Sequence, residues 1–129
     1  MIIDDDIQFL EYLKILLSRS GYRVRAFRDA RAAIRQLKEI PPKLVITDVY
    51  MPDFDGIEVL REARLVAPVI GLSGNVRGIN GTHASNILRL LRQLGAAAVF
   101  EKPIDHKAIL EEVRRYVVGS VTNRATSLR

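Results

Sequence analysis

Six polar side chains stand where apolar runs of the sequence end, and together they could do chemistry: Asp4, Asp5, Asp6, Asp48, Ser73 and Lys102. Carboxylates held close together repel one another, and a divalent ion with oxygen ligands relieves that repulsion. The chain has no cysteine, and no histidine stands beside these acids, so zinc and copper are disfavoured. These residue types therefore point to Mg²⁺.

Lys102 and Ser73 suit a phosphoryl group better than a metal. An ammonium attracts phosphoryl oxygens as a point charge, and a hydroxyl can donate a hydrogen bond to them. A carboxylate, Mg²⁺, a lysine and a hydroxyl together favour in-line transfer of a phosphoryl group onto the carboxylate. This chemistry requires a fold that brings distant parts of the chain to one place.

Short apolar runs alternate with segments of helical period, which predicts a parallel sheet with crossover helices. Asp29 has the position of a helix cap, while Gly21 and Gly95 are expected to end helices. The pattern predicts a three-layer α/β sandwich, a (βα)5 domain with a five-stranded parallel sheet. Ligands in such folds bind beyond the carboxyl ends of the strands, where the six polar residues fall. The expected strands cover residues 1–3, 22–27, 44–46, 69–72 and 98–100, each followed by a helix.

The length of 129 residues fits one domain, and 48% hydrophobic with 27% charged residues argues against disorder. We expect the domain over residues 1–119, and over 120–129 a polar, frayed tail or the start of a linker. No apolar run approaches the roughly 18 residues of a membrane span. The absence of cysteine suits a reducing compartment, so the predicted location is cytoplasmic, without membrane contact.

The formal net charge of +5 raises the question of nucleic acid. The basic residues are spread along the chain, and aromatic residues for base stacking are scarce. We therefore expect solvated helix faces and no direct binding of nucleic acid by this domain. The charge could still select an acidic partner surface.

Five motifs in order carry a family resemblance: IIDDD at 2–6, DVYMPDFDG at 48–56, Ser73, GA at 95–96 and KP at 102–103. On these motifs the chain resembles the chemotaxis-regulator-like receiver domains of two-component response regulators, which have a flavodoxin-like fold. The resemblance implies a phosphoprotein switch rather than an enzyme, with at most self-phosphorylation from small donors and autodephosphorylation. It implies phosphorylation by a histidine kinase or a histidine phosphotransfer protein, and output by binding a downstream protein effector. The late helices are also a candidate homodimer interface.

The resemblance also implies roles for particular residues. Asp48 matches the phosphoacceptor, Lys102 the lysine that pairs with phosphoryl oxygens, and Ser73 the hydroxyl residue that follows the phosphoryl group. The family's Mg²⁺ ligands correspond to Asp5, Asp48 and the backbone carbonyl of Tyr50, with Asp4 acting through a bound water. The bond between Lys102 and Pro103 is expected to be cis.

Three features depart from the family pattern. Val99 stands where many receivers have an aromatic switch residue, and Phe100 should point to the opposite face of the sheet. The segment from Ser73 to Gly95 is about seven residues longer than is common. Little chain precedes Ile2, so we expect the natural start to lie upstream.

Two other functions stay open. A phosphorylation-independent interaction module with the same fold is favoured by Val99 and the long segment, and is opposed by the intact acids and Lys102. A small aspartate-nucleophile phosphatase could use Asp4 and Asp6, but the DVYMPDFDG segment would then go unexplained. Asp6 by itself is better explained as a helix cap than as a ligand.

Overall fold

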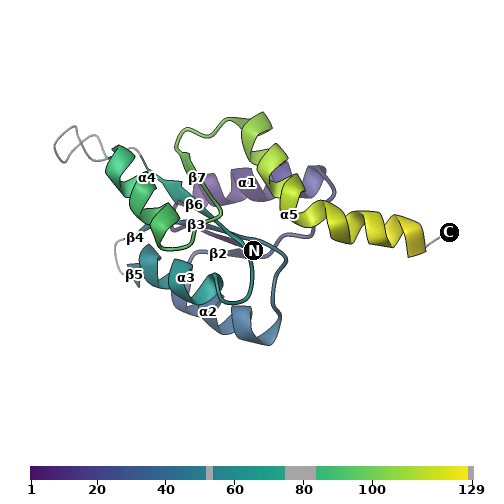
Figure 1. Cartoon of the computed structure of the whole chain (residues 1–129), viewed down its shortest axis with the longest axis horizontal. Helices are drawn as coiled ribbons and strands as arrows, with labels where there is room; N and C mark the ends of the chain where they lie inside the picture. The colour runs from purple at the N-terminus through teal and green to yellow at the C-terminus, as the bar shows by residue number, and fades with distance from the viewer. Residues whose placement is uncertain (52–53, 75–83, 128–129) are drawn as a thin grey trace.

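A five-stranded parallel sheet forms the centre of the molecule (Figure 1). The structure is a computed structural model, and it describes residues 1–51, 54–74 and 84–127. Every neighbouring pair in the sheet is parallel, as the alternating pattern predicted. The spatial order is β2-β1-β3-β6-β7, formed by β1 (Ile2–Ile3), β2 (Ala26–Phe27), β3 (Val45–Asp48), β6 (Val69–Ser73) and β7 (Ala98–Glu101).

Helices cover both faces of this sheet, which makes the predicted three-layer (βα)5 sandwich (Figure 1). On one face lie α1 (Ile7–Arg19) and α5 (His106–Ser127). On the other lie α2 (Ala30–Glu39), α3 (Gly56–Ala63) and α4 (Ala84–Gln93). The strand order reverses its direction of growth at β1 and β3, so the edge of the sheet beyond these two strands is where such folds bind ligands.

Alternating side chains of the strands fill two hydrophobic clusters. Ile3 and Val45 pack with α2, α3 and α4, whereas Ile2 and Ile46 pack with α1 and α5. Because both faces are covered, the strands are apolar at successive positions rather than at every second one. Burial of each such side chain contributes about 1.5–3 kcal/mol, which holds the strand ends at fixed places.

The helix ends follow the predicted signals. The Asp6 side chain accepts hydrogen bonds from the N–H groups of Gln8 and Phe9, and so caps α1. Asp29 caps α2 by accepting from the N–H of Arg31. Gly95 follows α4 with a φ of 109°, a conformation that glycine adopts at little cost.

Three elements differ from the sequence expectation. A small antiparallel pair, β4 (Tyr50–Met51) with β5 (Phe54–Asp55), stands between β3 and α3, where the sequence indicated no strand. The second strand has only two of its six expected residues. The last helix, α5, continues to Ser127, past Gly119, where the sequence led us to expect the helix to end. A single glycine costs a helix only about 1 kcal/mol, and no proline follows it to end the helix. Whether the domain ends at residue 119 stays a prediction.

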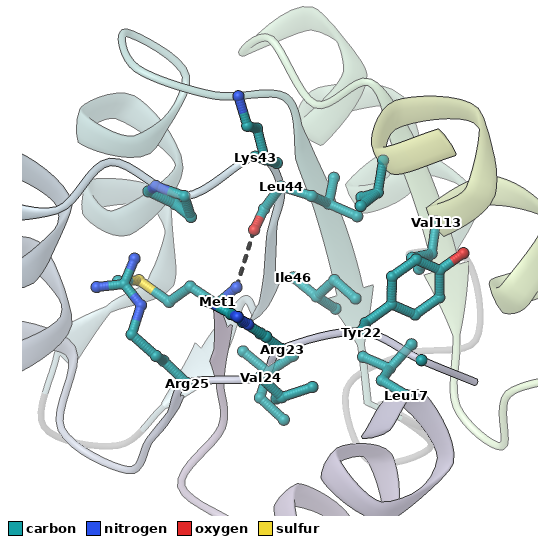
Figure 2. A pocket seen from close by; sticks show the side chains of 14 residues that line it. Met1, Leu17, Tyr22, Arg23, Val24, Arg25, Lys43, Leu44, Ile46 and Val113 are labelled. Carbon is teal, nitrogen blue, oxygen red and sulfur yellow. Dashed lines mark hydrogen bonds between the residues drawn. The ribbon is translucent and has the colours of Figure 1, made fainter. Parts of the chain in front are cut away.

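A cavity of about 250 Å³ lies at the amino-terminal end of the sheet, between the starts of β1 and β3 and the end of α1 (Figure 2). The Met1 nitrogen donates a hydrogen bond of 3.0 Å to the Leu44 carbonyl at its edge. Its lining includes Leu17, Tyr22, Arg23, Val24, Arg25 and Lys43. None of the six polar residues lines it. Among the described residues, no helix combines the length and apolar character needed to span a membrane.

Candidate functional site

Three aspartates meet at the carboxyl ends of two neighbouring strands. Asp4 and Asp5 follow β1, and Asp48 is the last residue of β3, which pairs directly with β1. Each of the three offers a carboxylate oxygen, and these oxygens lie within 4.8 Å of one another. Asp4 and Asp48 are buried, with 2% and 4% of their surface exposed, whereas Asp5 is the most accessible of the three. The structure therefore brings these three of the six polar residues together.

Lys102 brings a positive charge to the same place. Its Nζ donates a hydrogen bond of 2.7 Å to Asp4 Oδ2 and lies 3.6 Å from Asp48 Oδ2. The backbone N–H of Lys102 donates to the Ser73 carbonyl at 2.8 Å, which fixes the lysine just past the end of β7. The bond between Lys102 and Pro103 is cis, as expected.

The surroundings of Asp4 disfavour its charged form. Burial raises the pKa of the Asp4 carboxyl, while the hydrogen bonds from Lys102 and from the Asp6 N–H, at 2.9 Å, act in the opposite direction. The nearby Asp5 charge adds to the increase. Among the described residues, the Lys102 ammonium is the cation that the salt bridges place at these carboxylates.

Gly56 lets α3 approach the backbone at the end of β3. A Cβ atom on Gly56 would lie 2.5 Å from Val49 Cα and 2.7 Å from the Asp48 carbonyl oxygen, distances that no real side chain tolerates. The Asp-Gly pair that ends the 48–56 motif therefore has a structural reason. Only glycine allows the helix to start against the strand that carries Asp48.

Two other predicted site residues lie beside the cluster. Ser73 is buried at the end of β6, and its hydroxyl donates to the Gly74 carbonyl at 3.3 Å. Tyr50 begins β4 two residues beyond Asp48. Their roles stay predictions. Most of the long segment after Ser73, residues 75–83, lies outside the described residues, as does His83.

Val99 and Phe100 take opposite sides of β7, as predicted. Val99 packs against the cluster beneath α2, α3 and α4, and Phe100 against the cluster beneath α1 and α5. Sequence reasoning missed a different aromatic residue: Phe9, in the first turn of α1, holds its ring 4.1 Å from Lys102 Nζ. Helical spacing marked Phe9 as apolar but could not indicate that contact.

The donor set fits a hard divalent cation. Asp4, Asp5 and Asp48 supply only carboxylate oxygens, and Mg²⁺ is usually held by one or two carboxylates with waters and phosphate oxygens. Burial raises the pKa of the Asp4 carboxyl, and a bound cation would favour its charged form. The cluster could therefore hold Mg²⁺.

Fold and site together define an α/β protein with an acidic pocket and a lysine at the switch point of a doubly wound sheet. The model of the response regulator receiver domain family matches residues 1–114, and the chain belongs to this family. Receiver domains are the phosphorylated switch domains of two-component systems rather than enzymes with turnover. They generally bind Mg²⁺ at an acidic pocket, and histidine kinases phosphorylate the response regulators that contain them.

Individual relatives agree with this assignment. KdpE, a transcriptional regulatory protein of Mycobacterium tuberculosis, is 36% identical over 119 residues, which cover 91% of this chain and 50% of that protein. The chain thus spans about half the length of this relative. The response regulator receiver protein CpdR of Brucella abortus is 27% identical over 93% of this chain and 97% of its own length. A receiver domain structure from Clostridium thermocellum, 25% identical, superposes with a TM-score of 0.77 and covers 99% of this chain and 96% of that one.

Proposed function

We propose that this domain is a switch activated by phosphorylation of Asp48, with a histidine kinase or a histidine phosphotransfer protein as donor. The observation that carries the proposal is the placement of the Lys102 ammonium between Asp4, at 2.7 Å, and Asp48, at 3.6 Å. A carboxylate next to a fixed ammonium and two further acids is arranged to receive a phosphoryl group and to neutralise its charge.

The transfer is an in-line displacement at phosphorus. A carboxylate oxygen of Asp48 forms the new bond to phosphorus as the bond from phosphorus to the donor histidine nitrogen breaks, and that nitrogen keeps the electron pair. Lys102 pairs with the phosphoryl oxygens, and the Ser73 hydroxyl donates to one of them. Mg²⁺ would be held by Asp5, Asp48 and the Tyr50 carbonyl, with Asp4 acting through a water, and would neutralise the charge on the phosphoryl oxygens.

The output we propose is binding of a protein effector. A phosphoryl group shifts an existing equilibrium between two conformations, and an effector that prefers one of them reads the change. A phosphorylation-independent interaction module is the second candidate. It is favoured by Val99, since an aliphatic residue on the face toward α3 and α4 lacks the ring of the usual switch.

Incubation with acetyl phosphate and Mg²⁺ tests the proposal. The intact mass should rise by one phosphoryl group, and the increase should be absent in Asp48→Asn and when Mg²⁺ is chelated. Glu111→Gln, which removes an exposed carboxylate on α5, is the control and should be phosphorylated like the wild type. A wild-type mass that does not change would favour the interaction module.

A further inference from the structure

Lys102 contacts an aromatic ring in addition to the acidic cluster. Its Nζ lies 4.1 Å from the centroid of the Phe9 ring. Phe9 is partly buried in the hydrophobic cluster between the sheet, α1 and α5. Because the face of an aromatic ring carries partial negative charge, it attracts a cation placed above it. The ammonium is thus held by two carboxylates on one side and by a ring of α1.

The contacts continue from Phe9 to the surface. The rings of Phe9 and Tyr12 are 6.2 Å apart between centroids and tilted by 48°. Tyr12 meets the ring of His106 edge-on, with centroids 5.4 Å apart. The Tyr12 hydroxyl lies 2.9 Å from Nδ1 and 2.6 Å from Nε2 of His106, the first residue of α5. An unbroken series of contacts therefore joins the acidic pocket to the exposed junction of α1 and α5.

Phosphorylation of Asp48 would change the starting point of this series, a step that rests on the proposed function. Lys102 now donates to Asp4, the nearer of its two acidic partners. Phosphorylation of Asp48 replaces the single charge of its carboxylate with a phosphoryl charge of about −1.5 to −2, and a bound cation competes with Lys102 for Asp4. Both effects draw the ammonium toward Asp48 and so change its position over the Phe9 ring.

Within the part of the chain that the structure describes, the ring contacts lie on the α1 and α5 face of β7, whereas the residue at the usual switch position on the opposite face is Val99. Valine is smaller than an aromatic residue, so a change of its rotamer moves less volume than the swing of a ring. On the α1 and α5 face the three consecutive contacts all involve aromatic rings or the lysine cation.

We propose that Phe9 positions the Lys102 ammonium and transmits its displacement on phosphorylation to the Tyr12–His106 pair. The junction of α1 and α5 then becomes a surface that differs between the two states. This adds an output surface to the switch and assigns Phe9 a positioning role in it.

NMR of the full chain with Mg²⁺ and beryllofluoride, a mimic of the phosphoryl group, tests this. The ring protons of His106 should shift when the mimic binds, with their signals identified by their loss in His106→Gln. Phe9→Leu should remove the shift, and Phe9→Tyr, which keeps a ring face, should restore it. Phe27→Leu is the matched control, because it removes a partly buried ring from the other face of the sheet and should leave the His106 shift intact.

The Val49 amide, next to Asp48, reports separately whether the mimic is bound. If the Val49 amide signal does not shift in the wild type, both the proposed function and this inference are contradicted. If it shifts while the His106 ring is unaffected, or if Phe9→Leu responds at His106 like the wild type, only the inference is overturned. Loss of the Val49 shift in Phe9→Leu, with rescue in Phe9→Tyr, would support the positioning of Lys102 by the ring.

Discussion

The Lys102 ammonium compensates the charge of two carboxylates that have almost no contact with solvent. Its own side chain is 18% exposed, so the three groups interact in surroundings that screen charge weakly. Removing one partner of such a group is costly, because the remaining charges stay buried without compensation.

Lys102→Met should lower the free energy of unfolding at neutral pH by about 2 kcal/mol without Mg²⁺. Lys107→Met, an exposed lysine on α5, should change it little. Urea unfolding followed by circular dichroism measures both. Equal effects of the two substitutions would contradict a specific role of Lys102.

The loss in Lys102→Met should depend on pH with a definite sign. Burial raises the pKa of Asp4, and removing Lys102 takes away contacts that lower it. A carboxyl whose pKa is raised by folding contributes its full stability below its unfolded pKa, about 3.9, and loses it as pH rises through the folded pKa. The deficit of Lys102→Met should therefore be smaller at about pH 4 than at about pH 7. A deficit that grows toward acid would show that Asp4 is not its source.

Mg²⁺ should stabilise the wild type, because an ion that binds only the folded state shifts the equilibrium toward it. In Asp5→Asn, Mg²⁺ should raise the Tm less, while the Tm without Mg²⁺ should be slightly higher because repulsion within the cluster is reduced. Glu111→Gln should behave like the wild type in both conditions. Thermal unfolding with and without the ion, at constant ionic strength, measures the difference.

At the scale of elements, close backbone packing fixes the start of α3 against the end of β3. Gly56 is the point of closest approach, where a Cβ atom would overlap the backbone of Val49. Packing of this kind fixes the direction in which the Asp48 side chain leaves the strand. The glycine of the Asp-Gly pair thus permits the close packing that orients the Asp48 side chain.

Gly56→Ala should destabilise the fold by about 3 kcal/mol, because backbone atoms rather than flexible side chains must move. It should also slow phosphorylation by acetyl phosphate. Gly74→Ala is the matched control, since a Cβ there would meet no atom within 4 Å. A Gly56→Ala protein as stable as Gly74→Ala would show that α3 can shift without cost.

The elements that the sequence predicted well are those whose apolar residues are buried in the hydrophobic core. Strands such as 69–72 and 44–46 were placed to within two residues, because both their faces are buried. The second strand was predicted too long, since it lies at the edge of the sheet and pairs only with β1. The pairing of Lys102 with Asp4 and its contact with Phe9 depend on side-chain rotamers, about which residue spacing says nothing. The position of the six polar residues was predictable, since the carboxyl ends of parallel strands share one edge.

At the scale of the molecule, α5 is longer than the sheet that it covers. The last residue of α5 known to pack in the hydrophobic clusters is Val117, whereas the helix itself continues to Ser127. The turns beyond Val117 therefore extend past the predicted limit of the domain at residue 119.

A chain ending at Gly119 should keep the free energy of unfolding of the full chain to within about 0.5 kcal/mol, because the clusters retain all their known members. It should also accept a phosphoryl group at the same rate. Urea unfolding and intact mass after treatment with acetyl phosphate provide the comparison. A marked loss of stability would move the domain boundary toward residue 127.

The sheet order has a consequence for when the protein can be modified. Asp4 and Asp48 become neighbours only after β1 and β3 have paired, and Lys102 comes from beyond β7, the strand paired last in chain order. A nascent or partly denatured chain carries every one of these amino acids and yet has no reactive centre. If Asp48 is phosphorylated as proposed, the modification should therefore be confined to chains in which β1, β3 and β7 have already assembled.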